Sequence, residues 1–400
     1  MRPLLISAAT LATCLGHGVE ATRAALAAGA SRLAPCRFET AHLETFVGEI
    51  EGVDNTVLPP ELATFDCRNN RAAELGLALD GFDAAVRAAA QRYGAGRIGV
   101  FIGTSTAGIL QTELAYRRRD PQGGALPADF DYRHTHNTFS VAEYVRARLG
   151  LEGPCAAIST ACSSSAKAFA SAARFVDAGV IDAAVVGGVD TLCLTTLYGF
   201  NSLELLSRAP CRPWDARRDG ISIGEAAAYF LLDGRAQEDD PDAMWVLGAG
   251  ESSDAWHMSA PHPEGRGARQ AMEQALRSAA IEPAAIDYVN LHGTGTPSND
   301  AAEDKAVVAL FGGDVACNST KGITGHTLGA AGAVEAMISV LAIRDGLVPR
   351  SAGTRVVDSS LHAGYDIAGG RRRIDRAMSN SFGFGGSNCS LVFARGSARP

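Results

Sequence analysis

Residues 155–165, CAAISTACSSS, run from a short apolar stretch into a cluster of small polar residues. The apolar part predicts a buried strand over Cys155–Ser159, and a helix is predicted from Ser163 to Ala178. A strand that turns into a helix is the repeating unit of α/β layering. The turn also places Cys162 at the start of a helix, where unpaired backbone N–H groups favour a thiolate over a thiol. The stretch predicts an α/β fold with a cysteine nucleophile at one of its turns; an inert buried cysteine is the alternative.

The same alternation continues along the chain. Further strands are predicted at Leu4–Ala8, Ile98–Ile102, Ala183–Val189, Ala227–Leu232, Ile286–Leu291, Val315–Asn318 and Cys389–Phe393. Further helices are predicted at Glu20–Ala28, Asn69–Arg92, Ser140–Leu149, Ala268–Ala279, Ala301–Leu310 and Gly329–Asp345. An acidic, proline-containing stretch, residues 234–242, interrupts the pattern and is typical of a linker. We therefore expect two halves, residues 1–238 and residues 239–400.

Composition excludes several classes of protein. A chain of 400 residues with 46% hydrophobic and 20% charged residues can bury a large core and is neither disordered nor collagen-like. The net charge of −8 gives no overall attraction for nucleic acid or anionic lipid. An acidic partner would therefore need a local cluster of basic residues.

The cysteines and the N-terminus bear on the compartment. Nine cysteines are an odd number and contain no CxxC pair, so a disulfide scaffold or a structural zinc site is not expected. The first 15 residues resemble a short signal peptide, but the polar breaks at Ser7 and Thr10 fit a buried first strand better. No later run of 18 apolar residues could span a membrane. We expect a cytoplasmic protein.

Three further segments carry residues that can do chemistry. His292 follows a predicted strand and so lies at the strand end where α/β folds bind ligands. Lys321 and His326 share a glycine-rich loop, residues 318–332, whose spacing can aim both side chains into one pocket. Phe382 and Phe384 alternate with glycines, which permits a hinged ring that gates a site. Each segment alone is also compatible with a structural role, such as a histidine bonded to loop backbone or a solvated lysine.

Together, Cys162, His292, Lys321 and His326 with the FGFGG stretch at 382–386 resemble the elongating β-ketoacyl-acyl carrier protein synthases of the thiolase superfamily. The resemblance spans the chain and includes RPWD at 212–215, SSDAWHM at 252–258 and TGH at 324–326. It implies a thiolase-like α-β-α-β-α five-layer fold built from two pseudo-repeated halves. Departures at Ser163–Ser165, at residues 224–227 and at His134-Thr135-His136 favour a specialised paralogue that serves aryl-polyene or polyketide chains. An H-x-H pair can ligate metal, but no third ligand is evident nearby, so a structural or solvated role is expected for His134 and His136.

The resemblance also implies roles for these residues in a decarboxylative Claisen condensation with malonyl-acyl carrier protein. Cys162 would carry the acyl chain, and its N–H and that of Phe384 would form the oxyanion hole, with Phe382 beside the gate. His292 and His326 would donate to the malonyl thioester oxygen, and Lys321 would order the site. No organic cofactor is implied. Glu335 would pair with Lys321 or with a structural cation whose other family ligands match Asn290, Ser379 and Asn380; the sequence leaves open whether a metal ion is bound.

Other interpretations are weaker. A thiolase needs a second catalytic cysteine in a C-x-G-x-G context, which Cys389 lacks, and the starter-type condensing enzymes have an asparagine where this chain has His326. A non-catalytic chain-length partner typically loses the nucleophile, which this chain keeps. The S-x-x-K pattern at Ser164–Lys167 lacks the S-D-N and K-T-G companions of serine acylases.

The expected partners are the acyl carrier protein with its malonyl and acyl thioesters, and a second subunit, either a copy of this chain or a homologous ketosynthase subunit. Because carrier proteins are acidic, docking on this acidic chain requires a local basic patch. The candidates are Arg68, Arg71, Arg117, Arg118 and Arg119, with Arg208 and Arg212 as weaker ones. Ordinary solvated helix faces are the alternative for any single arginine.

Overall fold

The computed structural model describes residues 1–236 and 238–399. Its strands are β1 (Leu4–Thr13), β2 (Gly16–His17), β3 (Ala34–Pro35), β4 (Phe46–Gly48), β5 (Ile98–Gly103), β6 (Cys155–Ile158), β7 (Ala183–Asp190), β8 (Ile223–Gly224), β9 (Ala226–Asp233), β10 (Met244–Ser253), β11 (Tyr288–Asn290), β12 (Ala316–Asn318), β13 (Leu347–Val348), β14 (Gly370–Arg371), β15 (Arg376–Gly383) and β16 (Ser387–Arg395). Its α-helices are α1 (Gly18–Ala28), α2 (Arg68–Leu77), α3 (Phe82–Tyr93), α4 (Ile109–Arg117), α5 (Ser140–Arg148), α6 (Ser164–Asp177), α7 (Leu194–Ser202), α8 (Arg266–Ala279), α9 (Pro297–Phe311), α10 (Lys321–Thr324) and α11 (Ala331–Asp345).

The main sheet consists of two sections with the same strand order. Over the described part of the chain, one section runs β6-β5-β7-β9-β1 and the other β12-β11-β15-β16-β10. In the first section, β5 is parallel to β6 and β7, and β9 is antiparallel to β7 and β1. In the second section, β11 is likewise parallel to β12 and β15, and β16 is antiparallel to β15 and β10. The sections join where β1 pairs antiparallel with β10, Leu4 beside Val246. The expected pseudo-repeat is therefore present. The boundary at residue 238 stays a prediction, and Gln237 of the linker lies outside the described residues.

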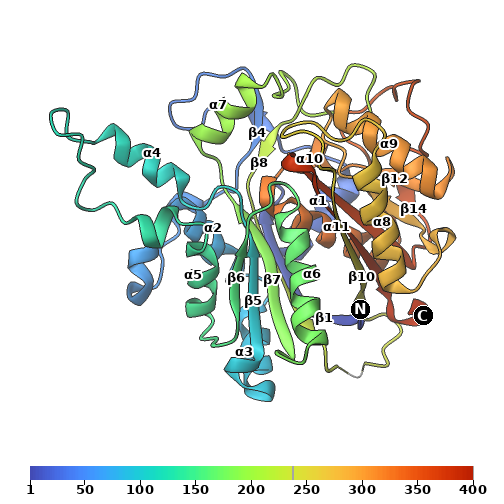
Figure 1. Cartoon of the computed structure of the whole chain (residues 1–400), viewed down its shortest axis with the longest axis horizontal. Helices are drawn as coiled ribbons and strands as arrows, with labels where there is room; N and C mark the ends of the chain where they lie inside the picture. Colours follow the sequence, from blue (N-terminus) through green and yellow to red (C-terminus); the bar gives the residue numbers. More distant parts are fainter. Residues whose placement is uncertain (237, 400) are drawn as a thin grey trace.

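Helices cover both sections on both faces (Figure 1). α6 and α11 pack against each other and against the inner faces, where Phe169, Ile338, Phe230 and Phe393 share one core. α2, α3 and α5 cover the outer face of the first section, and α8 and α9 cover that of the second. The predicted α-β-α-β-α order of five layers is confirmed.

The two central helices touch at their first turns. A Cβ on Gly332 would lie 2.5 Å from the backbone nitrogen of Ala166, so only glycine allows this approach. The N–H of Ala333 also donates to Ser165 Oγ over 2.9 Å. Both helices therefore begin at the same place, where the two halves meet.

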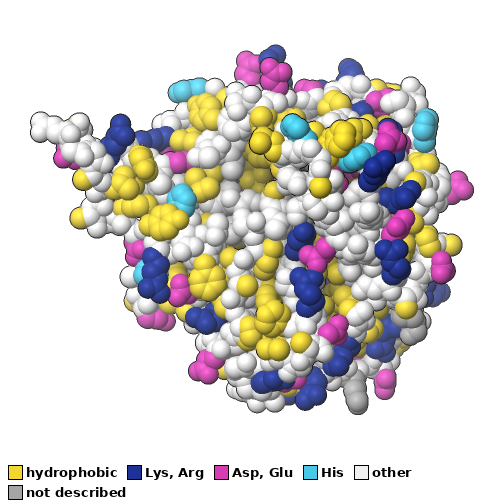
Figure 2. Space-filling model, viewed as in Figure 1, with side chains coloured by type: hydrophobic (Ala, Val, Ile, Leu, Met, Phe, Trp, Pro, Cys, Tyr) yellow, Lys and Arg dark blue, Asp and Glu magenta, His cyan; other side chains and the backbone are white. Residues whose placement is uncertain are grey.

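Two of the differences from the sequence prediction lie between residues 69 and 136. The helix predicted over Asn69–Arg92 is broken into α2 and α3 at Asp80 and Gly81, which have φ values of 53° and 69°. The Asp80 carboxylate accepts hydrogen bonds from Thr10 Oγ1 and the Val19 N–H, which holds the break against β1 and α1. Residues from α4 to the π-helical turn Tyr132–His136 form an arm that projects from the body (Figure 1) and carries exposed apolar side chains (Figure 2), among them Tyr116 and Tyr132.

A helix that spans a bilayer must be both long and apolar. Within residues 1–236 and 238–399, none of the helices is both.

Candidate active site

Cys162 lies on a tight elbow between β6 and α6. Ala161 adopts a left-handed backbone conformation with φ of 53°, which turns the chain before the helix begins. The serines around it close the elbow, because Ser164 Oγ accepts from the Thr160 N–H and Ser163 Oγ donates to the Thr160 carbonyl, each over 2.9 Å. These serines, which differ from the residues usual at these positions in the family that the chain resembles, therefore have a structural role beside the nucleophile.

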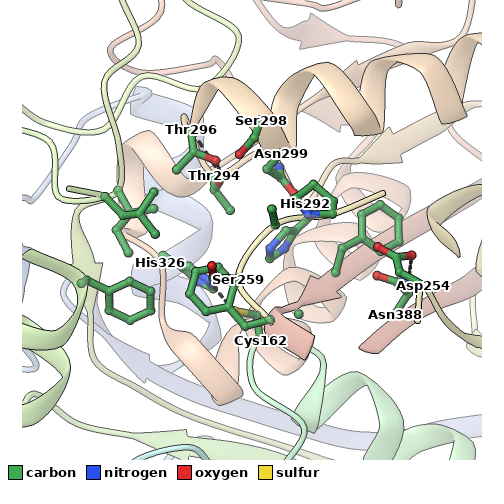
Figure 3. Close-up of a pocket in the computed structure, with 18 residues that line it drawn as sticks. Cys162, Asp254, Ser259, His292, Thr294, Thr296, Ser298, Asn299, His326 and Asn388 are labelled. Atoms are coloured by element: carbon green, nitrogen blue, oxygen red, sulfur yellow. Dashed lines mark hydrogen bonds between the residues drawn. The ribbon is translucent and has the colours of Figure 1, made fainter. Parts of the chain in front are cut away.

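Two imidazoles face the Cys162 sulfur (Figure 3). His326 Nε2 lies 2.9 Å from Cys162 Sγ, and the His292 and His326 rings stand almost perpendicular with centroids 5.3 Å apart. All three side chains are buried and line a cavity whose wall also includes Phe200, Phe382 and Phe384. The structure thus brings Cys162 close to two histidines that lie 130 or more positions later in the sequence.

Burial opposes ionisation of the cysteine. Burial raises the pKa of Cys162 from 9.0 to about 11, against the opposing effects of the Lys321 charge and the Phe384 N–H. Desolvation of the sulfur thus opposes the effect of the helix terminus, and the thiolate expected at the helix start stays a prediction. Burial, with a further contribution from the Lys321 charge, holds the pKa values of His292 and His326 well below 6.5, so both imidazoles are neutral.

Lys321 sets the orientation of His292. Its ammonium donates to the His292 carbonyl and lies 3.4 Å from His292 Nδ1. Because a lysine ammonium can only donate, Nδ1 accepts and the ring proton sits on Nε2. Lys321 also forms a buried ion pair with Glu335, and burial raises the pKa of Glu335 to about 7 despite the attraction of the lysine.

Glu303 is a site residue that the sequence analysis missed. Its two carboxylate oxygens accept from the N–H groups of His292 and Gly293, each over 2.8 Å, and fix the loop that carries the imidazole. The available signal was the acidic set Asp300, Glu303 and Asp304, which lies at helical spacing on one face of α9 and is buried.

Two loops meet beside the cavity at the FGFGG turn. A Cβ on Gly383 would lie 2.9 Å from the Thr160 carbonyl oxygen and 3.2 Å from the Cys162 nitrogen, so glycine lets this turn lie against the elbow. Asn388 Nδ2 donates to Asp254 Oδ1 over 2.9 Å (Figure 3). Asp254 Oδ2 accepts from the His262 N–H over 2.9 Å. Asp254, also unpredicted, therefore ties the loop up to His262 to the turn that holds Phe384.

Three of the four predicted cation ligands each have a buried oxygen without a hydrogen-bond partner among the described residues. Asn290 and Ser379 are register partners on the parallel strands β11 and β15. Asn290 Oδ1, Ser379 Oγ and Glu335 Oε2 are buried and have no hydrogen-bond partner among the residues described. The side chain of Asn380 is not available, because it bonds to Glu303, Met272 and Ser390.

A transition metal at the catalytic cluster is disfavoured. The ligand atoms of Cys162, His292 and His326 lie within 4.8 Å of one another, a geometry that could in principle accept a metal ion. However, the Lys321 ammonium lies 3.4 Å from His292 Nδ1 and would repel a cation bound by that ring. The same positive charge favours a reaction that builds negative charge in the cavity.

The predicted carrier-binding arginines do not form one free patch. Arg68 is wrong as a docking residue, since it is buried and makes a bidentate ion pair with Glu225. Arg71 pairs with Asp66 over 2.6 Å, Arg118 with Asp129 over 3.0 Å, and Arg117 lies 3.8 Å from Glu39. Arg119 is exposed on the arm.

The unfamiliar histidine pair lies away from the cavity. His134 Nδ1 bonds to Asp131 over 2.6 Å, and His136 Nδ1 bonds to Thr112. The two rings have separate partners, which fits the structural role expected for them.

Comparison with known proteins agrees with this geometry. Residues 1–238 match the family described as β-ketoacyl synthase, N-terminal domain, and residues 244–355 match β-ketoacyl synthase, C-terminal domain. A 3-oxoacyl-[acyl-carrier-protein] synthase 2 of Vibrio cholerae is 32% identical over 98% of this chain and 99% of that protein. The ketosynthase ApeO of Xenorhabdus doucetiae, solved in complex with its chain length factor ApeC, gives a TM-score of 0.89 at 37% identity over 98% of each chain. A β-ketoacyl synthase of Burkholderia phymatum gives a TM-score of 0.85 at 28% identity over 99% of this chain and 100% of that one. The chain belongs to the β-ketoacyl synthase family.

Proposed function

We propose that this protein is a condensing enzyme that joins an acyl chain on Cys162 to malonyl-acyl carrier protein, releasing carbon dioxide and β-ketoacyl-acyl carrier protein. The observation that carries the proposal is the contact of 2.9 Å between the Cys162 sulfur and His326 Nε2 in a buried cavity that also holds His292. A chain length factor without catalysis is disfavoured because the nucleophile and both imidazoles are present and adjacent.

The first half-reaction loads the cysteine. His326 Nε2 takes the thiol proton as Cys162 Sγ attacks the thioester carbonyl, and the N–H groups of Cys162 and Phe384 stabilise the oxyanion. The C–S bond of the incoming thioester then breaks, and the leaving thiolate takes the proton back from His326. The products are the acyl-enzyme and the free carrier thiol, with no net uptake of protons.

The second half-reaction forms the carbon–carbon bond. The malonyl thioester oxygen accepts from the Nε2–H groups of His292 and His326 while the bond to the carboxylate breaks and carbon dioxide leaves. The electron pair of that bond becomes an enolate, whose carbon attacks the acyl carbonyl on Cys162. The bond to sulfur breaks, and the thiolate takes one proton from solvent. His326 can accept in one step and donate in the next because its Nδ1 has no partner among the described residues to hold one tautomer.

The unpartnered buried oxygens of Asn290, Ser379 and Glu335 are the candidate ligands of a structural cation. The three orphaned oxygens of Asn290, Ser379 and Glu335 would hold it, and an alkali or other hard cation prefers such oxygen ligands. Its charge would stabilise the Glu335 carboxylate and thereby the placement of Lys321.

Partner and compartment belong to the same proposal. The resemblance to ApeO, which is solved with a chain length factor, supports a ketosynthase subunit of an aryl-polyene or related pathway. The apolar arm and the edge strand β6, which pairs on one side only, support assembly with a homologous subunit or a second copy. We place the enzyme in the cytoplasm, which agrees with nine cysteines that are all free thiols.

The direct test is to trap the acyl group. Incubation with an acyl-carrier protein should add the acyl mass to the peptide that contains Cys162, and later addition of malonyl-carrier protein should remove it and release carbon dioxide. The Cys162→Ala variant should show neither event. Absence of an acyl adduct on the wild-type peptide would refute the condensing function and favour a chain length factor.

The raised pKa of Cys162, about 11, leads to a prediction for alkylation of the free enzyme. A thiol below its pKa gains thiolate about tenfold per pH unit, so the rate of iodoacetamide modification at Cys162 should still rise between about pH 8 and pH 10. An ordinary cysteine, with a pKa of about 8.5, levels off in that range. Mass spectrometry of the Cys162 peptide at each pH measures the rate. A plateau beginning below about pH 7 would instead indicate a preformed thiolate–imidazolium pair.

A further inference from the structure

The two catalytic imidazoles are held in place differently. His292 Nδ1 lies 3.4 Å from the Lys321 ammonium, and the His292 N–H donates to the Glu303 carboxylate. His326 Nδ1 is buried and has no hydrogen-bond partner among the described residues. The placement of the His326 ring against the Cys162 sulfur (Figure 3) must therefore come from the backbone that carries it.

That backbone is anchored at two points. His326 itself forms a parallel bridge with Ile223 of β8. Three residues later, the Gly329 N–H donates to Asp190 Oδ2. Between these anchors, Leu328 has a φ of 52°, a left-handed conformation that residues with bulky side chains rarely adopt. Such a conformation persists only where the surrounding structure holds it, and the bond to Asp190 supplies the second hold.

The same carboxylate also holds the turn that follows β5. Asp190 is fully buried at the end of β7. Its Oδ1 accepts from the N–H groups of Ser105 and Thr106, each over 2.8 Å, and from the hydroxyl groups of Thr104 and Thr106, each over 2.7 Å. With the Gly329 N–H on Oδ2, five donors converge on this one side chain. An ionised carboxylate, which only accepts, suits such a set of donors.

The turn after β5 in addition contacts the elbow between β6 and α6. Ser105 Oγ donates over 3.4 Å to the carbonyl of Ala161, the residue directly before Cys162. A Cβ on Gly329 would lie 2.7 Å from Ser105 Oγ and 2.8 Å from Asp190 Oδ2, so the loop that carries the imidazole packs directly on both groups. Asp190 thus lies between the segment that carries the sulfur and the loop that carries its imidazole partner.

We infer that Asp190 is a positioning residue that sets the distance between His326 Nε2 and Cys162 Sγ. This inference rests on the proposed function, in which His326 takes the proton of the thiol. Each histidine loop is then held by its own buried carboxylate, and Glu303 has the corresponding place under His292. Asp190 acts through backbone N–H groups and not by touching the substrate.

The test is a cycle of substitutions at Asp190 and His326. Asp190→Asn keeps the size of the side chain but replaces one acceptor oxygen by an amide donor, which meets N–H donors in either orientation. Acylation of Cys162 by an N-acetylcysteamine thioester should slow roughly 10-fold to 100-fold, because a misplacement of about 1 Å can have an effect of that size. In the His326→Ala background, where the base is absent, Asp190→Asn should change the rate less than about twofold.

The kinetic constants with the carrier substrate separate positioning from loss of binding. In Asp190→Asn, kcat for condensation should fall with acylation, while KM for malonyl-carrier protein should stay within about threefold of the wild-type value. The reason is that the contacts of His292 with Lys321 and Glu303 are left intact. A variant that had lost the structure of the cavity would change both constants.

The matched control is Asp215→Asn. Asp215 is likewise buried and accepts three backbone N–H groups, from residues 217, 355 and 356. This control should acylate at the wild-type rate, because these bonds hold a different loop. The inference fails if Asp215→Asn loses as much as Asp190→Asn, if Asp190→Asn acylates like the wild type, or if its loss is as large in the His326→Ala background.

Two provisions keep the outcomes distinct. Should Asp190→Asn not fold, Gly329→Ala takes its place in the cycle, because the added Cβ would push the loop away from Asp190. Alkylation of Cys162 by iodoacetamide gives the same cycle without a thioester: Asp190→Asn should slow it in the wild-type background and not in His326→Ala. A wild type that is alkylated but never acylated refutes the proposed function, whereas the alkylation cycle still judges the role of Asp190.

Discussion

Replacing His292 by alanine should lower the rate of condensation roughly 100-fold to 1,000-fold while leaving acylation of Cys162 close to the wild-type rate. The reason is geometric: His326, not His292, lies against the sulfur, whereas the Nε2–H of His292 is free for the malonyl oxygen because Lys321 holds its Nδ1. Losing one oxyanion donor costs about that factor. Single-turnover acylation and carbon dioxide release from malonyl-carrier protein measure the two steps separately.

Two variants serve as controls for this prediction. His292→Asn keeps an N–H donor and should recover part of the lost condensation. His326→Ala should slow acylation as well, by roughly 100-fold to 10,000-fold, because it removes the general base. Equal losses of acylation in His292→Ala and His326→Ala would show that the two imidazoles do not divide the work in this way.

Replacing Glu335 alone by leucine should lower the free energy of unfolding by about 3–5 kcal/mol. The side chains of Lys321 and Glu335 are only 1% and 4% exposed, so removal of the carboxylate leaves an ammonium without its partner in the interior. The double variant Lys321→Met/Glu335→Leu should recover most of that loss, since replacing both charges by apolar groups removes the desolvation penalty. Urea unfolding of the three proteins measures the differences.

Activity separates the two roles of the pair. The double variant should fold but condense poorly, because His292 loses the lysine that fixes its tautomer. A double variant no more stable than Glu335→Leu would mean that the neighbouring oxygens of Asn290 and Ser379, rather than the ion pair, govern stability at this position.

The parts of the fold that the sequence predicted correctly are those with uninterrupted patterns. β5, β7 and β9 are buried apolar runs, and the helical stretches around α6 and α11 extend over several turns. β10 escaped prediction because glycines interrupt it. A Cβ on Gly250 would lie 2.1 Å from the Ala271 carbonyl oxygen, so close packing by α8 demands a residue that weakens the strand signal. β15 escaped because its buried face contains Ser379 and Ser381, whose polarity is typical of a loop.

The order of the motifs was enough to identify the reactive residues, but it could not predict their burial or their protonation. The position of Cys162 before a helix is local information, whereas the burial that raises its pKa arises from segments more than 100 residues away. Arg68 gives a second example, since a basic residue at a helix start reads as exposed until Glu225, 157 positions later, folds onto it. Long-range partners of this kind leave no trace in local spacing.

The contact between the first turns of α6 and α11 has an electrostatic consequence. Each helix carries roughly half a positive elementary charge at its N-terminus. Because the pseudo-repeat uses one module twice, it points both positive ends at the same small volume, one behind Cys162 and the other just beyond His326. The duplicated module thus uses backbone dipoles alone to create a positive electrostatic field that stabilises an anionic intermediate. Surface substitutions leave this field unchanged as long as the first turns of the two helices stay in contact.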